Sequence, residues 1–90
     1  MDVAAVHIVV RGRVQGVWYR GSAQARASEL NLTGWARNCP DGTVEIHAEG
    51  GREQLDQFIE WCRNGPPAAE VAGLDTTTVP PEGMETFLIR

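Results

Sequence analysis

Residues 33–49 read TGWARNCPDGTVEIHAE and carry the signals of two strands joined by a tight turn. From residue 44 to residue 48 every second residue is apolar, which predicts a strand with one buried face. Residues 33–38, with Trp35 among them, predict a short strand before it. The Pro-Asp-Gly sequence at residues 40–42 favours a tight turn, because Pro fixes its own φ and Asp-Gly accepts positive φ values. An antiparallel hairpin is therefore predicted at the centre of the chain.

A helix is predicted on each side of this hairpin. Before the hairpin, apolar residues recur at spacings of four, four and three, which gives a narrow apolar helix face: Tyr19, Ala23, Ala27 and Leu30. This helix is expected to stop near Leu30, since Asn31 tolerates the left-handed conformation that closes helices. After the hairpin, apolar residues fall at i, i+3, i+4 and i+7: Leu55, Phe58, Ile59 and Cys62. The second helix is expected to end at Asn64-Gly65, before two prolines.

Three further strands complete the expected fold. Alternating apolar residues predict a first strand over residues 5–11, and weaker patterns predict strands over residues 70–77 and 86–90. The order strand, helix, strand, strand, helix, strand, with a short last strand, predicts an α+β protein of the ferredoxin-like kind. Such a two-layer sandwich has an antiparallel sheet with two helices on one face. Residues 1–90 are expected to form a single domain.

Composition narrows the location and the partners. No apolar run approaches the roughly 20 residues of a membrane helix, and the first residues lack the basic and apolar regions of a signal peptide. A cytoplasmic protein without membrane contact is therefore expected, and its small size favours a monomer. The net charge of −4 argues against nucleic-acid binding, because phosphate backbones attract broad basic surfaces.

The charges are unevenly placed. Residues 3–28 contain no Asp or Glu but hold four of the arginines, which favours a local anion site in an acidic protein: Arg11, Arg13, Arg20 and Arg26. All eight basic residues are Arg, so chemistry that needs a lysine, such as a Schiff base or the lysine-bearing nucleotide loop, is excluded.

Residues 12–20, GRVQGVWYR, connect the first predicted strand to the first predicted helix. Backbone N–H groups at a helix start lack partners, and Gly16 allows them to converge around an anion. Arg20 adds a guanidinium whose planar fork matches two phosphate oxygens. The loop is therefore interpreted as a candidate phosphate site.

This loop resembles the signature of the acylphosphatase family, a glycine, any residue, Val-Gln-Gly-Val, any residue, an aromatic residue and Arg. A second block of that family is also present: Gly34-Trp35, Asn38 and Asp41-Gly42. Two shorter matches follow in the expected order: Ala48-Glu49-Gly50 and Gly65-Pro66. The resemblance covers essentially the whole chain and implies the same sandwich fold. It also implies hydrolysis of acyl phosphates to a carboxylate and inorganic phosphate, without metal or cofactor.

The resemblance also implies roles for individual residues. Arg20 and Asn38 are expected to be catalytic, Arg20 by binding the phosphate and Asn38 by orienting the attacking water. Backbone N–H groups are expected to assist Arg20 in binding the substrate: Val14, Gln15, Gly16, Val17, Trp18 and Tyr19. A carboxamide can hold a water but cannot take its proton, so we hypothesise that a phosphate oxygen of the substrate accepts it.

The sequence departs from the family pattern at two places. Asn31 replaces a common glycine, which should be harmless because Asn also accepts the left-handed conformation. Cys39-Pro40 lies next to Asn38 and could alter its placement.

The sequence gives little support to a cysteine phosphatase or a metal-dependent hydrolase. A cysteine phosphatase needs an Arg six positions after its thiol, but Glu and Ala stand six positions after Cys39 and Cys62. Both thiols are expected to be free, with Cys62 in the core. His7 and His47 lack the spacing of metal ligands and are interpreted as strand residues. Glu45 and Glu49 are expected to share a polar outer face with His47.

A non-catalytic alternative stays open, namely a regulatory module that binds phosphate or another anion on the same fold. RNA recognition on such a sheet would need stacking aromatic residues on the central strands. The first and third predicted strands carry none.

Overall fold

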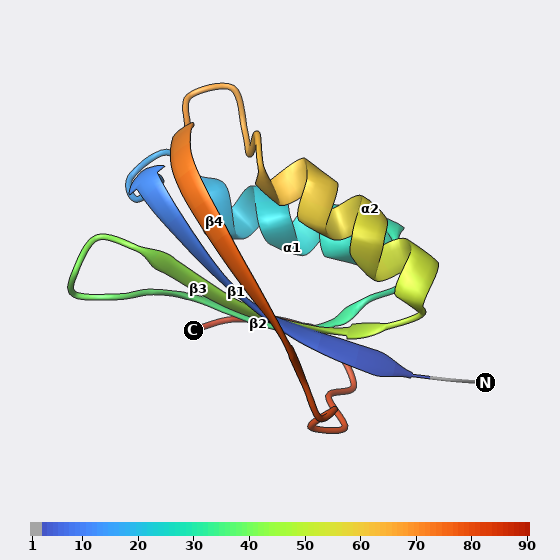
Figure 1. Cartoon of the computed structure of the whole chain (residues 1–90). Helices are drawn as coiled ribbons and strands as arrows, with labels where there is room; N and C mark the ends of the chain where they lie inside the picture. The colour runs from blue at the N-terminus through green and yellow to red at the C-terminus, as the bar shows by residue number, and fades with distance from the viewer. Residues whose placement is uncertain (1–2) are drawn as a thin grey trace.

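The computed structural model describes residues 3–90, in which the elements follow the predicted order. They are β1 (Ala4–Arg13), α1 (Tyr19–Glu29), β2 (Thr33–Asn38), β3 (Val44–Gly50), α2 (Arg52–Cys62), β4 (Glu70–Val79) and β5 (Phe87–Ile89). The strands form one sheet in the order β4-β1-β3-β2-β5, and both helices lie on the same face of it (Figure 1). The predicted ferredoxin-like sandwich is confirmed. Within residues 3–90, no helix has the length and apolar character needed to cross a membrane.

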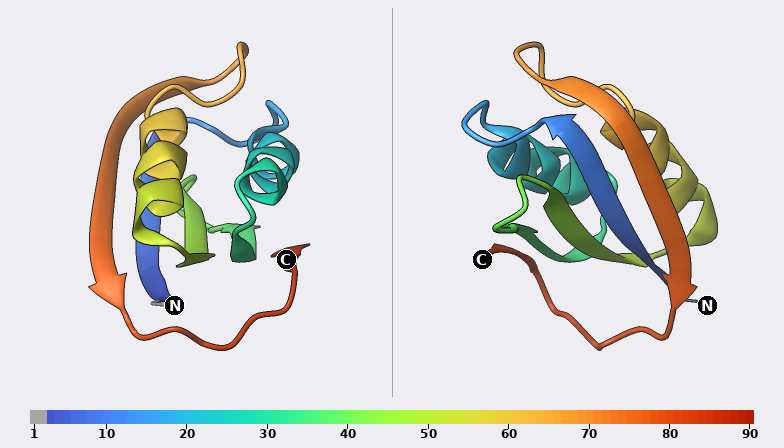
Figure 2. Two further views of the ribbon diagram at one scale, coloured as in Figure 1. Left: turned by 90° about the vertical axis from the view of Figure 1, so that its right-hand side faces the viewer. Right: turned by 60° about the vertical axis from the view of Figure 1, so that its left-hand side comes forward.

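The last strand, β5, differs from the others in its direction. β4, β1, β3 and β2 pair in an antiparallel manner, as predicted, whereas β5 pairs parallel to β2. Since β4 ends at the end of the sheet where β2 begins, a strand that starts there runs in the same direction as β2. Residues 80–86, called the crossing segment below, pass from one edge of the sheet to the other (Figure 2).

The core lies between the two helices and the central strands. α2 buries the apolar stripe predicted for it, with Leu55, Phe58 and Cys62 inaccessible to solvent. α1 buries mainly small residues against the sheet, among them Ala23 and Ala27, so that its backbone packs close to the strands. α1 packs mainly against β2 and β5.

The end of β1 and the end of α1 each depend on a residue with a positive φ. β1 is longer than predicted because it pairs with β4 as far as Arg13, with a register shift at Gly12. A Cβ at Gly12, where φ is 124°, would lie 2.2 Å from the backbone oxygen of Glu70. α1 is followed by Asn31 with φ 58°, the left-handed conformation expected there. Glycine at position 12 thus lets β4 pack against the strand end that leads into the loop.

Candidate active site

The loop of residues 14–18 joins β1 to α1 and carries two left-handed residues. Gly16 has φ 74° and Trp18, which precedes the first helical residue, has φ 65°. Alternation with left-handed residues turns successive N–H groups toward one point. Across residues 3–90, the backbone N–H groups of residues 15–20 donate to no protein acceptor, and Ser22 is the first to do so, to Trp18 O at 3.0 Å. These amides are therefore not engaged by protein acceptors and are available to a ligand.

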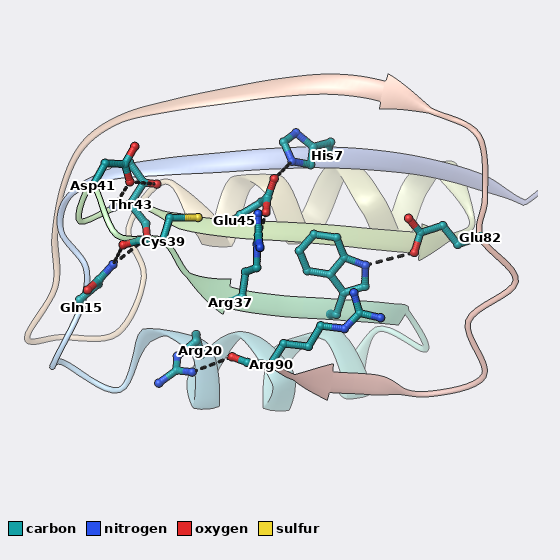
Figure 3. A network of polar contacts seen from close by, with 11 residues as sticks. His7, Gln15, Arg20, Arg37, Cys39, Asp41, Thr43, Glu45, Glu82 and Arg90 are labelled. Atoms are coloured by element: carbon teal, nitrogen blue, oxygen red, sulfur yellow. Dashed lines mark hydrogen bonds and ion pairs between the residues drawn. The ribbon is translucent and has the colours of Figure 1, made fainter.

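Arg20 lies in the first turn of α1 and is oriented from the end of β5. Its Nη1 donates a hydrogen bond of 3.0 Å to the backbone oxygen of Arg90 (Figure 3). Within the described part of the chain, no Asp or Glu side chain forms an ion pair with Arg20. The guanidinium is thus oriented by a main-chain oxygen and keeps further N–H donors for a ligand.

Asn38 is the last residue of β2 and faces the same cavity as Arg20. This cavity has a volume of about 530 Å³, and the loop residues Val14, Gly16 and Val17 also line it. Among residues 3–90, the Asn38 carboxamide has no hydrogen-bond partner. The structure brings the two residues and the loop together, and the carboxamide is available to a water or substrate.

The turn after Asn38 is closed by another residue. Asp41 Oδ1 accepts hydrogen bonds from the backbone N–H of Thr43 at 3.0 Å and from its hydroxyl at 2.7 Å. The hydroxyl bond, followed by the backbone bond, holds the pKa of Asp41 below its ordinary value. Asn38 is therefore not needed to initiate the turn, and Cys39-Pro40 is accommodated without involving its side chain.

Gln15 connects the phosphate loop to this turn, a role that the sequence did not reveal. Its Nε2 donates to the backbone oxygens of Cys39 at 2.8 Å and Thr43 at 2.9 Å (Figure 3). The side chain thereby sets the distance between the loop and the strand end that carries Asn38. The only sequence signal was a polar residue between the apolar Val14 and Gly16-Val17.

Tyr19 lines the same cavity, but it is buried and belongs to the core. Its hydroxyl donates to the backbone oxygen of Cys62 at 2.7 Å, and burial raises its pKa. Burial also raises the pKa of the Cys62 thiol to about 12, so this thiol is protonated at neutral pH. The prediction that Cys62 is a buried core residue is confirmed.

The polar outer face expected around His47 is partly wrong, because His47 and Glu49 are each only 3% exposed. The crossing segment covers them, and Glu49 accepts backbone N–H bonds from Glu82 at 2.6 Å, Gly83 at 3.1 Å and Met84 at 3.3 Å. His47 Nε2 donates to Glu49 at 2.6 Å. Burial alone would raise the pKa of Glu49, but the bonds from His47 and these amides outweigh it and lower the pKa.

His47, Glu49 and Glu82 have ligand atoms within 4.8 Å of one another, the arrangement of a possible metal site. Both Glu49 oxygens, however, already accept hydrogen bonds that fix the crossing segment. His7 is similarly engaged, since it donates to Glu45 at 2.6 Å, and Glu45 also pairs with Arg37 (Figure 3). These groups serve to tie strands and the crossing segment together.

Comparison with known proteins places these features in a family. Residues 6–89 match the Acylphosphatase family. A relative named acylphosphatase from Methylococcus capsulatus is 64% identical over 70 residues, which are 78% of this chain and 76% of the relative. The solved acylphosphatase from Coxiella burnetii superposes with a TM-score of 0.96 at 37% identity, covering 99% of this chain and 94% of that one. The Bacillus subtilis acylphosphatase gives 0.94 at 40% identity, covering 97% and 98%.

Proposed function

This chain belongs to the acylphosphatase family and hydrolyses acyl phosphates, and we propose that Arg20, Asn38 and the loop amides carry out the reaction. One observation carries this proposal. The loop, Arg20 and Asn38 all line one cavity, although they come from the loop, α1 and β2.

The phosphoryl group is bound by the backbone N–H groups of residues 14–19 together with Arg20. The amides have no competing acceptors among the described residues, and the start of α1 adds the positive end of a helix dipole. Arg20 is held toward the cavity by the backbone oxygen of Arg90, so little reorientation is needed when the substrate arrives. Inorganic phosphate, the product, is expected to bind in the same place.

Asn38 orients the attacking water on the other side of the phosphoryl group. Its carboxamide can hold the water but cannot take the proton, which passes to a phosphoryl oxygen of the substrate. The bond from phosphorus to the bridging oxygen breaks, and the carboxylate leaves without needing a general acid. Phosphoryl transfer through a loose transition state mainly requires positioning and charge stabilisation, which these groups supply.

The proposed mechanism takes its positive charge from Arg20 and the amides, and it uses no metal ion or cofactor. Turnover is therefore expected to be the same before and after dialysis against EDTA. Loss of activity in EDTA that returns with added Mg²⁺ would contradict this part of the proposal.

The proposed working form is a cytoplasmic monomer without nucleic-acid or membrane partners. Light scattering of the purified chain tests whether its mass is that of a monomer.

The function is tested by release of inorganic phosphate from benzoyl phosphate, with phenyl phosphate, a phosphate monoester, as the control. Rapid hydrolysis of benzoyl phosphate alone is expected, because only the mixed anhydride has a leaving group that departs without acid catalysis. A chain that binds inorganic phosphate but releases none from benzoyl phosphate would instead be the anion-binding regulatory module.

A further inference from the structure

Much of the cavity lining takes no part in the proposed phosphoryl chemistry. Besides the loop, Arg20 and Asn38, the walls include Trp18, Ala68 and Ile89. At about 530 Å³ the cavity lies within the size range of small-molecule sites and is larger than a phosphoryl group requires. In an acyl phosphate, the acyl carbon is joined to phosphorus through a single oxygen. The acyl group must therefore occupy the space directly beside the phosphoryl group, where these apolar residues lie.

Trp18 combines high exposure with a fixed position. The residue is 75% exposed, whereas Trp35 is 8% exposed. It adopts φ 65°, a conformation that residues other than glycine rarely adopt. The indole also packs directly on Gly21, since a Cβ at that position would lie 2.2 Å from an indole carbon. The ring therefore presents an apolar surface to the cavity that is ordered before any ligand binds.

We infer that Trp18, together with Ala68 and Ile89, forms an acyl subsite that favours aromatic acyl phosphates over acetyl phosphate. The inference rests on the proposed function, because it names the substrate class of that same site. An aromatic acyl group stacks on the indole and buries apolar surface. The methyl group of acetyl phosphate cannot stack and buries much less apolar surface. The absence of a side chain at Gly21 allows the indole to pack against the helix backbone at this position.

The test is the ratio of kcat/KM for benzoyl phosphate to kcat/KM for acetyl phosphate. Trp18→Ala is expected to lower this ratio about tenfold, the effect of losing a stacked aromatic contact. Trp18→Phe keeps an aromatic ring and is expected to restore most of the preference. Since both variants are compared on two substrates, a general loss of phosphoryl binding cancels in the ratio. An unchanged ratio in Trp18→Ala would overturn the subsite.

Two neighbours on β5 provide a matched pair. Ile89 and Leu88 are 41% and 42% exposed, but among the residues described by the structure the cavity is lined by Ile89 and not by Leu88. Ile89→Ala is expected to lower the ratio and Leu88→Ala to leave it unchanged. If Trp18→Ala weakens inhibition by inorganic phosphate, which signals a disturbed loop, this pair decides the question. Equal ratios in the two variants would count against the subsite.

Failure of the inference and failure of the proposed function give different results. If the parent protein releases phosphate from neither substrate, the proposed function is wrong. If it hydrolyses both, while the ratio is insensitive to Trp18 and Ile89, the reaction stands and the acyl subsite is wrong.

Discussion

Arg20 and Asn38 divide their roles according to the chemistry of their side chains. A guanidinium stays protonated at any working pH and bonds two phosphate oxygens at once. A carboxamide is neutral and offers one acceptor and two donors, which suits it to hold a water. Binding of phosphate should therefore depend on Arg20 and turnover on both residues.

Substitution of each residue by alanine separates these roles. Arg20→Ala is expected to lower kcat by at least ~10² to 10³, as for loss of one preorganised donor, and to weaken inhibition by inorganic phosphate. Asn38→Ala is expected to lower kcat while leaving phosphate inhibition largely intact, because the water contributes little to ground-state affinity. Steady-state rates with benzoyl phosphate and the phosphate inhibition constant measure both effects.

Arg52→Ala is the matched control, since it removes the same charge from an exposed position at the start of α2. Arg52→Ala is expected to change neither kcat nor the inhibition constant of inorganic phosphate. Equal loss of phosphate affinity in Arg20→Ala and Asn38→Ala would contradict the separate roles.

The two thiols should differ sharply in reactivity. Cys62 is buried with its pKa raised to about 12, whereas Cys39 is only partly buried in the turn. A thiol reagent such as DTNB is expected to titrate one thiol in the folded protein and two in denaturant, because only the thiolate reacts. Cys39→Ser should show no reactive thiol until it is unfolded. Rapid reaction of two thiols in the folded protein would contradict the burial of Cys62.

At the scale of elements, the relative placement of the phosphate loop and the end of β2 depends on Gln15. Its side chain bonds two backbone oxygens of the turn that follows Asn38. Both oxygens also accept a bond from within the turn, from Gly42 N to Cys39 O at 3.1 Å and from Cys39 N to Thr43 O at 2.8 Å. Gln15 is therefore a positioning residue more than a source of stability.

Gln15→Leu keeps the approximate size of the side chain and removes its donor. The free energy of unfolding is expected to fall by only about 1 kcal/mol, since neither carbonyl loses its last partner. Turnover is expected to fall about tenfold, because small displacements of an orienting group slow a reaction strongly. Urea denaturation and rates with benzoyl phosphate measure the two effects.

A double-mutant cycle identifies the route of this effect. If Gln15 acts through Asn38, then Gln15→Leu should lose most of its effect on turnover in an Asn38→Ala background. The same reduction in both backgrounds would show that Gln15 acts elsewhere.

At the scale of the whole molecule, Glu49 ties the crossing segment to the sheet. That segment leads into β5, and the chain after β5 places the Arg90 oxygen against Arg20. A buried carboxylate on one face of the sheet thus helps to fix a strand that orients the phosphate-binding arginine.

The pH dependence of stability tests this role of Glu49. Its pKa in the folded chain lies below the ordinary value of 4.5, so its stabilisation is fully present above that pH and is lost as the pH falls through the folded pKa. Glu49→Gln is expected to cost about 2 kcal/mol at pH 7, because an amide N–H meets backbone donors. The difference in the free energy of unfolding between the parent and Glu49→Gln should shrink as the pH falls. Urea denaturation from pH 7 to pH 3 measures this difference.

Glu85→Gln is the control for this experiment, because Glu85 is an exposed acid of the same crossing segment. It is expected to change the free energy of unfolding by less than about 0.5 kcal/mol. A gap between Glu49→Gln and the parent that stays constant down to pH 3 would contradict the lowered pKa.

Local signals predicted most of the fold. The apolar stripe of α2, the left-handed Asn31 and the turn at residues 40–42 depend on neighbours within a few positions, and the structure has all three. The parallel direction of β5 depends on where β4 ends, which no local pattern encodes. The burial of Glu49 likewise depends on a segment more than 30 positions further along the chain.

The site likewise combines features that the local sequence predicts with features that depend on distant residues. The motif supplied Arg20, Asn38 and the loop, whose convergence on one cavity the structure displays. The partners of Gln15 and the exposed, fixed indole of Trp18 follow from tertiary register and from packing on Gly21. Sequence patterns carry neither kind of information.

The contact between Arg20 and Arg90 joins residues 70 positions apart. Closing so long a loop is slow compared with forming a helix or the central hairpin, so this contact belongs to the late events of folding. A partly folded chain with only the helices and the central hairpin formed would still carry an unanchored guanidinium. Full catalytic competence therefore returns after secondary structure during refolding, and turnover reports completion of the fold more strictly than circular dichroism does.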